Sequence, residues 1–144
     1  MPSPTRMPTT HPPRRLSPLT LTVVALGFIG CAASRPPPPV ECPTQKFAFT
    51  REQSCRNDGS VEFCLPSDDA EALARVRAIA PDVRTMPSGG RARCDVPAQV
   101  LVLFPTPTSE CTERHGALQE PAWERLCRVA ALPAVQRVVP TWFE

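Results

Sequence analysis

Six cysteines between residues 42 and 127 constrain this chain more than any other feature of its sequence. Their intervals of 12, 8, 29, 16 and 15 residues contain no C-x-x-C pair. Close pairs of that kind are typical of structural zinc sites, whereas an even number of cysteines in a small exported domain is typical of disulfides. The pattern therefore predicts three disulfides, in any of fifteen pairings. The six residues are Cys42, Cys55, Cys64, Cys94, Cys111 and Cys127.

The start of the chain has the features of an export signal. Residues 1–15 are polar, with three arginines and no acidic residue, and residues 16–29 are mostly apolar. A short apolar stretch behind a positive flank is typical of a signal peptide, and it is shorter than the roughly 20 residues of a membrane-spanning helix. Arg14-Arg15 would suit a twin-arginine signal, but the residues that follow fit that motif poorly. We expect the general secretory route for the remainder of the chain.

The apolar stretch ends in Phe28-Ile29-Gly30-Cys31. This tetrapeptide resembles the lipobox of bacterial lipoproteins, in which a small residue precedes a cysteine that is acylated and becomes the mature N-terminus. The resemblance covers about 31 residues, with phenylalanine where leucine is usual, and implies a lipid anchor on Cys31. Ala32, in place of an aspartate, implies the outer membrane of the bacterial envelope. The alternative is an ordinary cleaved signal with an unrelated cysteine.

Residues 31–40 are expected to form the lipidated cysteine and a tether. Four consecutive prolines, at positions 36–39, favour an extended polyproline II segment of about 3.1 Å per residue. A spacer that holds the domain away from the membrane is the favoured interpretation. The alternative is a proline-rich ligand for an aromatic groove.

The charge of the predicted mature chain is close to neutral. Three of the 16 basic residues precede Cys31, which leaves 13 basic residues against 14 acidic ones, a net charge near −1. Nucleic-acid binding would need a strongly basic face, so no nucleic-acid partner is expected. The remaining 114 residues suffice for one domain, which we place at residues 41–144.

The first half of this domain is expected to contain two strands and a helix. Segments 46–50 and 60–65 have the composition of short strands, with turn-forming residues between them. A helix should follow Ser67 as its N-cap and end at Pro81, with an ion pair between Glu71 and Arg75. The acidic residues 68 and 69 are interpreted as capping and dipole-compensating groups.

The second half is expected to alternate strand, helix and strand. Residues 98–104 are nearly all apolar and should form a strand buried on both faces. A helix over 120–131 should carry an apolar stripe with Trp123 and Cys127, and residues 134–139 should form the last strand, followed by packing of residues 142 and 143. The order β-β-α-β-α-β predicts an α+β fold, a small disulfide-stapled sheet with two helices on one face. A ferredoxin-like sandwich is the nearest common architecture.

Loop 84–97 contributes the candidate binding residues. Its Gly89-Gly90 pair lacks the lysine and the spacing of a phosphate-binding loop. Arg84, Arg91 and Arg93 are candidates for contact with an anionic partner, and the alternative is a solvated loop face.

His115 is the only histidine of the predicted mature chain. A Cys–His nucleophile would need a free cysteine beside it, yet the even cysteine count indicates that nearby Cys111 is bonded; we select Cys127 as its partner. Neither G-x-S-x-G nor H-E-x-x-H occurs. We therefore expect an exposed loop histidine in a non-catalytic module that binds an envelope protein and uses no cofactor or metal. The alternative is a thiol-redox or cysteine-dependent enzyme that uses a cysteine near His115.

Overall fold

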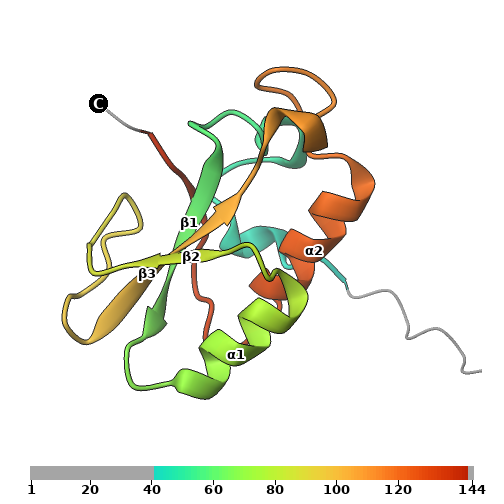
Figure 1. The fold of residues 1–144 in the computed structure, drawn as a ribbon. Coiled ribbons are helices and arrows are strands. Elements are labelled where there is room, and N and C mark those ends of the chain that lie inside the picture. Colours follow the sequence, from blue (N-terminus) through green and yellow to red (C-terminus); the bar gives the residue numbers. More distant parts are fainter. Residues whose placement is uncertain (1–40, 143–144) are drawn as a thin grey trace, which may run out of the picture. The chain divides into compact units, whose positions relative to one another are not determined.

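Between residues 41 and 142, one four-stranded sheet and two α-helices make up the fold (Figure 1). The computed structural model describes residues 41–142, so the predicted signal peptide, Cys31, the tether and Phe143 lie outside the described residues. Neither α-helix in this part of the chain is long and apolar enough to cross a membrane. The elements are β1 (Ser60–Pro66), α1 (Ala70–Ile79), β2 (Arg84–Met86), β3 (Gln99–Pro105), α2 (Glu120–Ala130) and β4 (Val139–Pro140), with short 3-10 helices η1 (Thr44–Lys46), η2 (Arg51–Gln53) and η3 (Thr108–Glu110).

The sheet has the strand order β2-β3-β1-β4 and is antiparallel throughout. Its central pair runs from Ser60 opposite Pro105 to Pro66 opposite Gln99. The chain order β-α-β-β-α-β, threaded through this strand order, is the connectivity of a ferredoxin-like sandwich. The expected fold class is therefore confirmed, although the expected chain order was wrong at two places.

The strand expected at residues 46–50 does not form. Residues 44–46 make the 3-10 helix η1, and only a single bridge, between Phe47 and Val138, joins this segment to the residues before β4. The next 3-10 helix begins directly afterwards, because the Thr50 and Gln53 side chains form a reciprocal capping box at its N-terminus. Three-residue turns on both sides leave too little extended chain for a strand.

Two further strand boundaries differ from the expectation. Residues 84–86, expected in a loop, form the edge strand β2, whose residues are exposed or half-buried. Such a strand has no run of apolar residues by which it could be detected. The last strand is only Val139–Pro140, because residues 132–135 form a turn in which the Val135 N–H donates to the Leu132 carbonyl oxygen over 3.1 Å.

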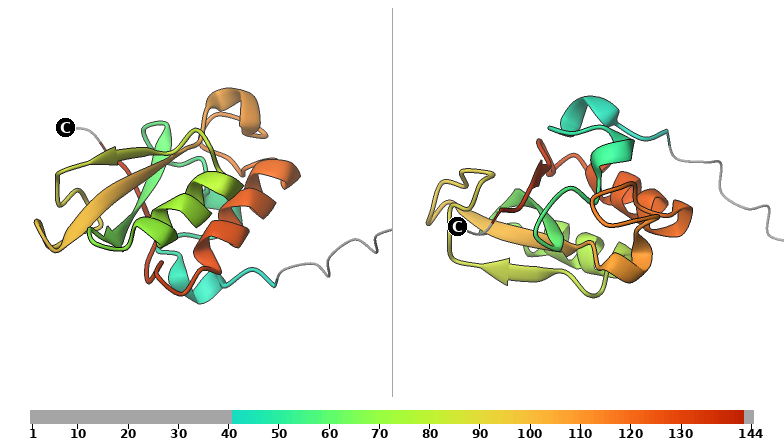
Figure 2. Two further views of the ribbon diagram at one scale, coloured as in Figure 1. Left: turned by 60° about the horizontal axis from the view of Figure 1, so that its bottom comes forward. Right: turned by 90° about the horizontal axis from the view of Figure 1, so that it is seen from above.

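The hydrophobic core lies between the sheet and both helices. Alternate residues of β1 turn Val61, Phe63 and Leu65 toward the helices, and all three are fully buried. They belong to one buried cluster with Val76 of α1 and Leu126 of α2. Figure 2 shows the two helices side by side on the same face of the sheet, as predicted.

The two helices follow the expected sequence signals with one correction. The α1 N-cap is Asp69, whose Oδ1 accepts the N–H of Ala72 over 2.8 Å. Ser67 instead donates its hydroxyl to the Pro97 carbonyl oxygen over 2.7 Å, because the chain is still leaving the sheet at that position. The Glu71–Arg75 ion pair forms as predicted. The α2 stripe is also confirmed: Trp123, Leu126, Cys127 and Ala130 are buried.

Three disulfides staple the domain, as the cysteine pattern predicted. They join Cys42 to Cys127, Cys55 to Cys111 and Cys64 to Cys94, with Cα–Cα distances of 4.8, 6.2 and 5.4 Å. The bonds are nested: the outer loop encloses the middle one, which encloses the inner one.

The expected bond between Cys111 and Cys127 was wrong. Cys111 forms a bridge with Leu118, and the Cys55 N–H donates to the carbonyl oxygen of Gly116 over 2.9 Å. These contacts place Cys55 beside Cys111 before the chain enters α2. Cys127 lies two turns into that helix, where its sulfur meets Cys42.

Candidate functional site

The helix-free face of the sheet is where the candidate site lies. Cross-strand partners point to the same face, so the register places Arg84, Leu103 and Glu62 in one row. A second row holds Met86 and Leu101, with Cys64 beyond them. The connection between β2 and β3, residues 87–98, folds back over these rows.

Three contacts hold this connection on the sheet. The Cys64–Cys94 disulfide anchors its middle. The N–H of Ala92 donates to Oε1 of Glu62 over 2.9 Å. Gly90 has φ +56°, and a Cβ there would lie only 2.6 Å from the nearest Leu101 methyl carbon. The glycine is therefore required both by its backbone conformation and by the close approach.

Glu62 is a buried carboxyl group at the base of this face, with 2% of its surface exposed. Burial raises its pKa above the usual 4.5, while backbone hydrogen bonds from Ala92 and Arg91 and the charge of Arg91 oppose that rise. Its oxygens thus hold the connection in place. The sequence offered one signal for this position: Glu62 interrupts an apolar strand at the parity opposite to Val61 and Phe63.

A shallow groove of about 310 Å³ opens between the connection and the residues after β4. Met86 and Trp142, on its rim, are 43% and 37% exposed and are two of the three large hydrophobic residues exposed in the range 41–142. The prediction that β3 is buried on both faces is confirmed at Leu101 but wrong at Leu103, which is half-buried in this groove. The lining residues are Glu62, Met86, Ser88, Gly90, Arg91, Leu101, Leu103, Thr141 and Trp142.

The three candidate arginines do not form one cluster around the groove. Arg91 lines it, and its Nε donates to the carbonyl oxygen of Trp142 over 3.2 Å. Arg84 is exposed at the end of the row that contains Leu103. Arg93 adopts φ +59° and lines a separate small hollow with Arg137. The structure therefore brings Arg91 to the groove and leaves Arg93 outside it.

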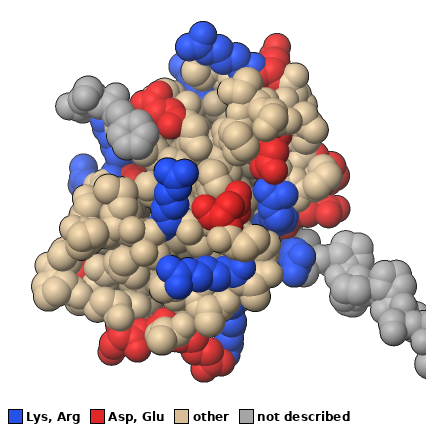
Figure 3. All heavy atoms as spheres, in the orientation of Figure 1, with Lys and Arg blue, Asp and Glu red and all other residues tan. Residues whose placement is uncertain are grey.

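Charge is mixed on the surface that Figure 3 shows. Blue and red side chains are interspersed there, and no large region carries one sign. The candidate groove, in contrast, combines apolar side chains with one arginine on its rim. Recognition at this groove would depend mainly on apolar contact, with Arg91 as a directional polar group.

His115 lies in an exposed loop, as predicted, with φ +66°. It lines a hollow of about 280 Å³ together with Cys55, Cys111 and Arg114. The two cysteines are bonded to each other and are only 5% and 9% exposed. The structure thus brings His115 to the cysteine named in the sequence analysis, but that cysteine is in a disulfide.

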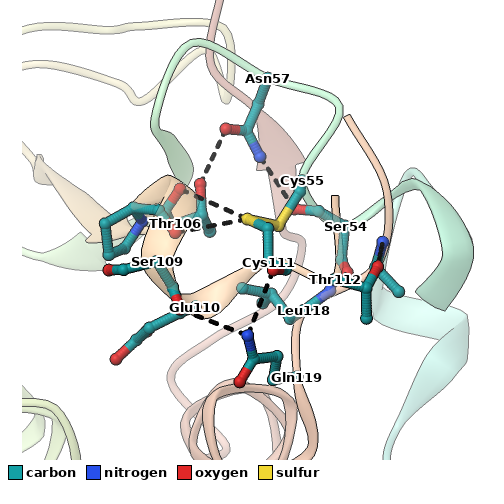
Figure 4. Close-up of a disulfide and its surroundings, with 12 residues drawn as sticks. Ser54, Cys55, Asn57, Thr106, Ser109, Glu110, Cys111, Thr112, Leu118 and Gln119 are labelled. Atoms are coloured by element: carbon teal, nitrogen blue, oxygen red, sulfur yellow. Dashed lines mark hydrogen bonds between the residues drawn. A yellow bond between two sulfur atoms is a disulfide. The ribbon is translucent and has the colours of Figure 1, made fainter. Parts of the chain in front are cut away.

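Hydrogen bonds fix the surroundings of the Cys55–Cys111 disulfide, which Figure 4 shows in close-up. Asn57 is buried beside it, donates from Nδ2 to the Ser54 carbonyl oxygen and accepts the Thr106 hydroxyl, each over 2.8 Å. On the other side, Gln119 donates from Nε2 to the Cys111 carbonyl oxygen over 3.2 Å. This packing is typical of a structural disulfide.

Comparisons with known proteins add no relatives. No family model matches the chain, and no curated protein or solved structure matches it. Between residues 41 and 142, no group of three or more His, Cys, Asp or Glu side chains is placed to hold a metal ion. The proposals that follow rest on this chain's own residues.

Proposed function

We propose that this chain is a bacterial lipoprotein, anchored to the outer membrane through Cys31, whose folded domain is a non-catalytic module that binds an envelope protein. The anchor is supported by the resemblance of residues 28–31 to a lipobox, behind a positive flank and a short apolar stretch. The disulfide-stapled fold fits an oxidising compartment outside the cytoplasm.

The groove on the helix-free face of the sheet carries the interaction part of this proposal. Met86 and Trp142 expose large apolar side chains on its rim, and Arg91, which donates to the Trp142 carbonyl oxygen, lines the same groove. Aromatic residues, methionine and arginine are the residue types enriched at protein–protein interfaces. An apolar groove with one arginine therefore fits a protein segment better than a small charged ligand.

Site-specific photocrosslinking tests the interaction surface. A photoreactive amino acid at Met86, in cells that express the full chain, should give an adduct heavier than the monomer. Arg77, exposed on α1, is the matched control position and should give no adduct of that mass. Equal adducts at both positions, or none at Met86, would contradict the groove as the interaction surface.

The anchor has its own test. Cells labelled with a radioactive fatty acid should incorporate label into the wild-type chain and not into Cys31→Ser. Equal labelling of the two would rule out lipidation at this cysteine. This test is independent of the groove, so the two parts of the proposal can fail separately.

The alternative, a thiol-redox or cysteine-dependent enzyme, needs a thiol near His115. The cysteine closest to it in the sequence, Cys111, is bonded to Cys55, and both are buried. Within residues 41–142, all six cysteines are in disulfides, so this part of the chain offers no free thiol to His115. Binding of the envelope partner should accordingly survive His115→Ala.

A further inference from the structure

A second groove lies on the helix side of the molecule, between the segment before β1 and the start of α2. Its volume is about 500 Å³. Three aromatic rings form its apolar part: Phe47 lies 5.3 Å from Phe49 and 5.3 Å from Trp123, measured between ring centroids. We call it the aromatic groove; its lining residues are Thr44, Phe47, Ala48, Phe49, Thr50, Arg51, Gln53 and Trp123.

The walls of the aromatic groove are fixed in place. Cys42 is bonded to Cys127 on α2, one turn beyond Trp123. The N–H of Ala48 donates to the carbonyl oxygen of Val138 over 2.9 Å. The guanidinium of Arg51 lies over the Trp123 ring at 5.8 Å and pairs with Glu120. A preformed groove loses little conformational entropy when a ligand enters it.

The chemistry of the groove suits a proline-rich segment. Grooves lined by aromatic side chains bind polyproline II helices, which are already extended before binding. Phe47 and Phe49 are half-buried, so part of each ring remains accessible. This chain contains such a segment in Pro36–Pro39, which ends three positions before Cys42, the first residue of the outer disulfide.

The prolines lie within reach of the groove. The Cα atoms of Cys42 and Cys127 are 4.8 Å apart, and Trp123 precedes Cys127 by about one helical turn of 5.4 Å rise, so Trp123 is within ~11 Å of Cys42. Pro39 lies three positions before Cys42, a span of up to ~10 Å, and Pro36 lies six positions before it, a span of up to ~20 Å. Both ends of the proline run can therefore reach the rings.

A sharp turn at Pro43 lies between the proline run and the segment that lines the groove. Pro43 has φ −77° and ψ 68°, and the Thr44 N–H donates to the Cys42 carbonyl oxygen over 2.8 Å. These values define an inverse γ-turn. The segment that lines the groove begins at Thr44, directly after this turn. A ligand tethered so closely has an effective concentration in the millimolar range.

We propose that Pro36–Pro39 dock in the aromatic groove of their own chain. Docked prolines draw the predicted tether against the domain, and released prolines return it to its extended length. The groove would thereby regulate how far the domain stands from its attachment point. The docking itself depends only on the aromatic groove and the proline run, whereas its effect on the distance from the attachment point rests on the proposed lipid anchor.

Photocrosslinking within the purified full chain, solubilised in detergent, tests the docking. A benzophenone amino acid replaces Ala48, which is exposed and lines the groove, and mass spectrometry locates the cross-link. We expect attachment within residues 35–40 in a product of monomer mass. Ala78, exposed on α1, is the matched control position and should give at least tenfold less of this product.

Two variants make the result specific. Replacing Pro36–Pro39 with alternating Gly and Ser should lower the yield at least tenfold, and Phe49→Ser should do the same while circular dichroism shows an unchanged fold. A yield that does not depend on the prolines, or attachment elsewhere, would overturn the proposal. A product of twice the monomer mass would also overturn it, in favour of docking onto a second copy of the chain.

Discussion

The ammonium nitrogen of Lys46 lies 2.6 Å from the carbonyl oxygen of Val135 and also donates to the carbonyl oxygens of Ala130 and Leu132, over 2.8 and 3.1 Å. The last carbonyl groups of a helix have no partner within the helix and carry its negative dipole end. The only lysine of the chain thus caps the C-terminus of α2 and orders the turn that follows.

Removing this cap should destabilise the domain. Lys46→Met keeps the aliphatic stem and removes three charge-assisted hydrogen bonds, so we expect a loss of about 2–3 kcal/mol in the free energy of unfolding. Denaturation with urea under non-reducing conditions measures it. Arg77→Ala, an exposed cation on α1, is the control and should change the stability by less than about 0.5 kcal/mol. Equal effects of the two substitutions would contradict the capping role.

The outer disulfide should contribute strongly to stability. It closes a loop with a sequence separation of 85 residues, and loss of a native disulfide typically costs about 2–5 kcal/mol. We therefore expect Cys127→Ser to be strongly destabilising. Alkylation of the non-reduced variant, followed by mass spectrometry, should find one free thiol among the cysteines of residues 41–142, on Cys42. A modified Cys111 in its place would contradict the pairing.

The buried carboxyl of Glu62 should make stability depend on pH. Its pKa is raised by burial, so between the usual 4.5 and the raised value the native state keeps a proton that the unfolded chain has released. The contribution of this group to the free energy of unfolding is therefore present at low pH, and it falls as the pH rises through that window. Glu62→Gln removes the titration, so the variant should gain stability relative to the wild type as the pH rises.

Urea denaturation at several pH values, from about 4 to 8, measures this difference. Glu124→Gln, at an exposed position on α2, controls for the substitution itself. A constant gap between the wild type and Glu62→Gln across the series would show that the carboxyl does not titrate differently in the two states.

Alanine substitutions at Gly59 and Gly90 should distinguish the cost of backbone strain from the cost of steric contact. Gly59 and Gly90 both have positive φ, +88° and +56°, but a Cβ on Gly59 meets nothing within 4 Å, whereas one on Gly90 meets Oε2 of Glu62 at 2.7 Å. Gly59→Ala should cost about 1–2 kcal/mol. Gly90→Ala should cost more by roughly another 1–3 kcal/mol, because the connection must move off the sheet. Thermal unfolding of both variants measures the two losses of stability. Equal losses would contradict the close packing at Gly90.

The strongest local patterns were predictable from the sequence. Pro121 in the first turn and an apolar stripe that includes Trp123 and Leu126 predict helix α2. The structure places this helix at Glu120–Ala130. The central strands β1 and β3 are likewise visible, because burial against the helices demands consecutive or alternating apolar residues.

The edge elements and the disulfide pairing were not predictable in this way. Strand β2 is defined by its hydrogen bonds to β3, and its exposed residues carry no apolar pattern. Cys111 and Cys127 are consecutive cysteines in the sequence. Each nevertheless bonds to a more distant cysteine, through tertiary contacts that only the complete fold creates. The groove at Met86 and Trp142 also depends on tertiary structure, since it joins β2 to the residues after β4.

The nesting of the disulfides determines how the domain responds to mechanical tension. A pull between the chain before Cys42 and the chain after Trp142 passes through the sulfur atoms to Cys127 in α2, and bypasses everything from residue 43 to 126. Within residues 41–142, only the fifteen residues after Cys127, residues 128–142, can be drawn out, a lengthening limited to about 50 Å. The sheet strands β1, β2 and β3, the helix α1 and the other two disulfides bear no load along this covalent path.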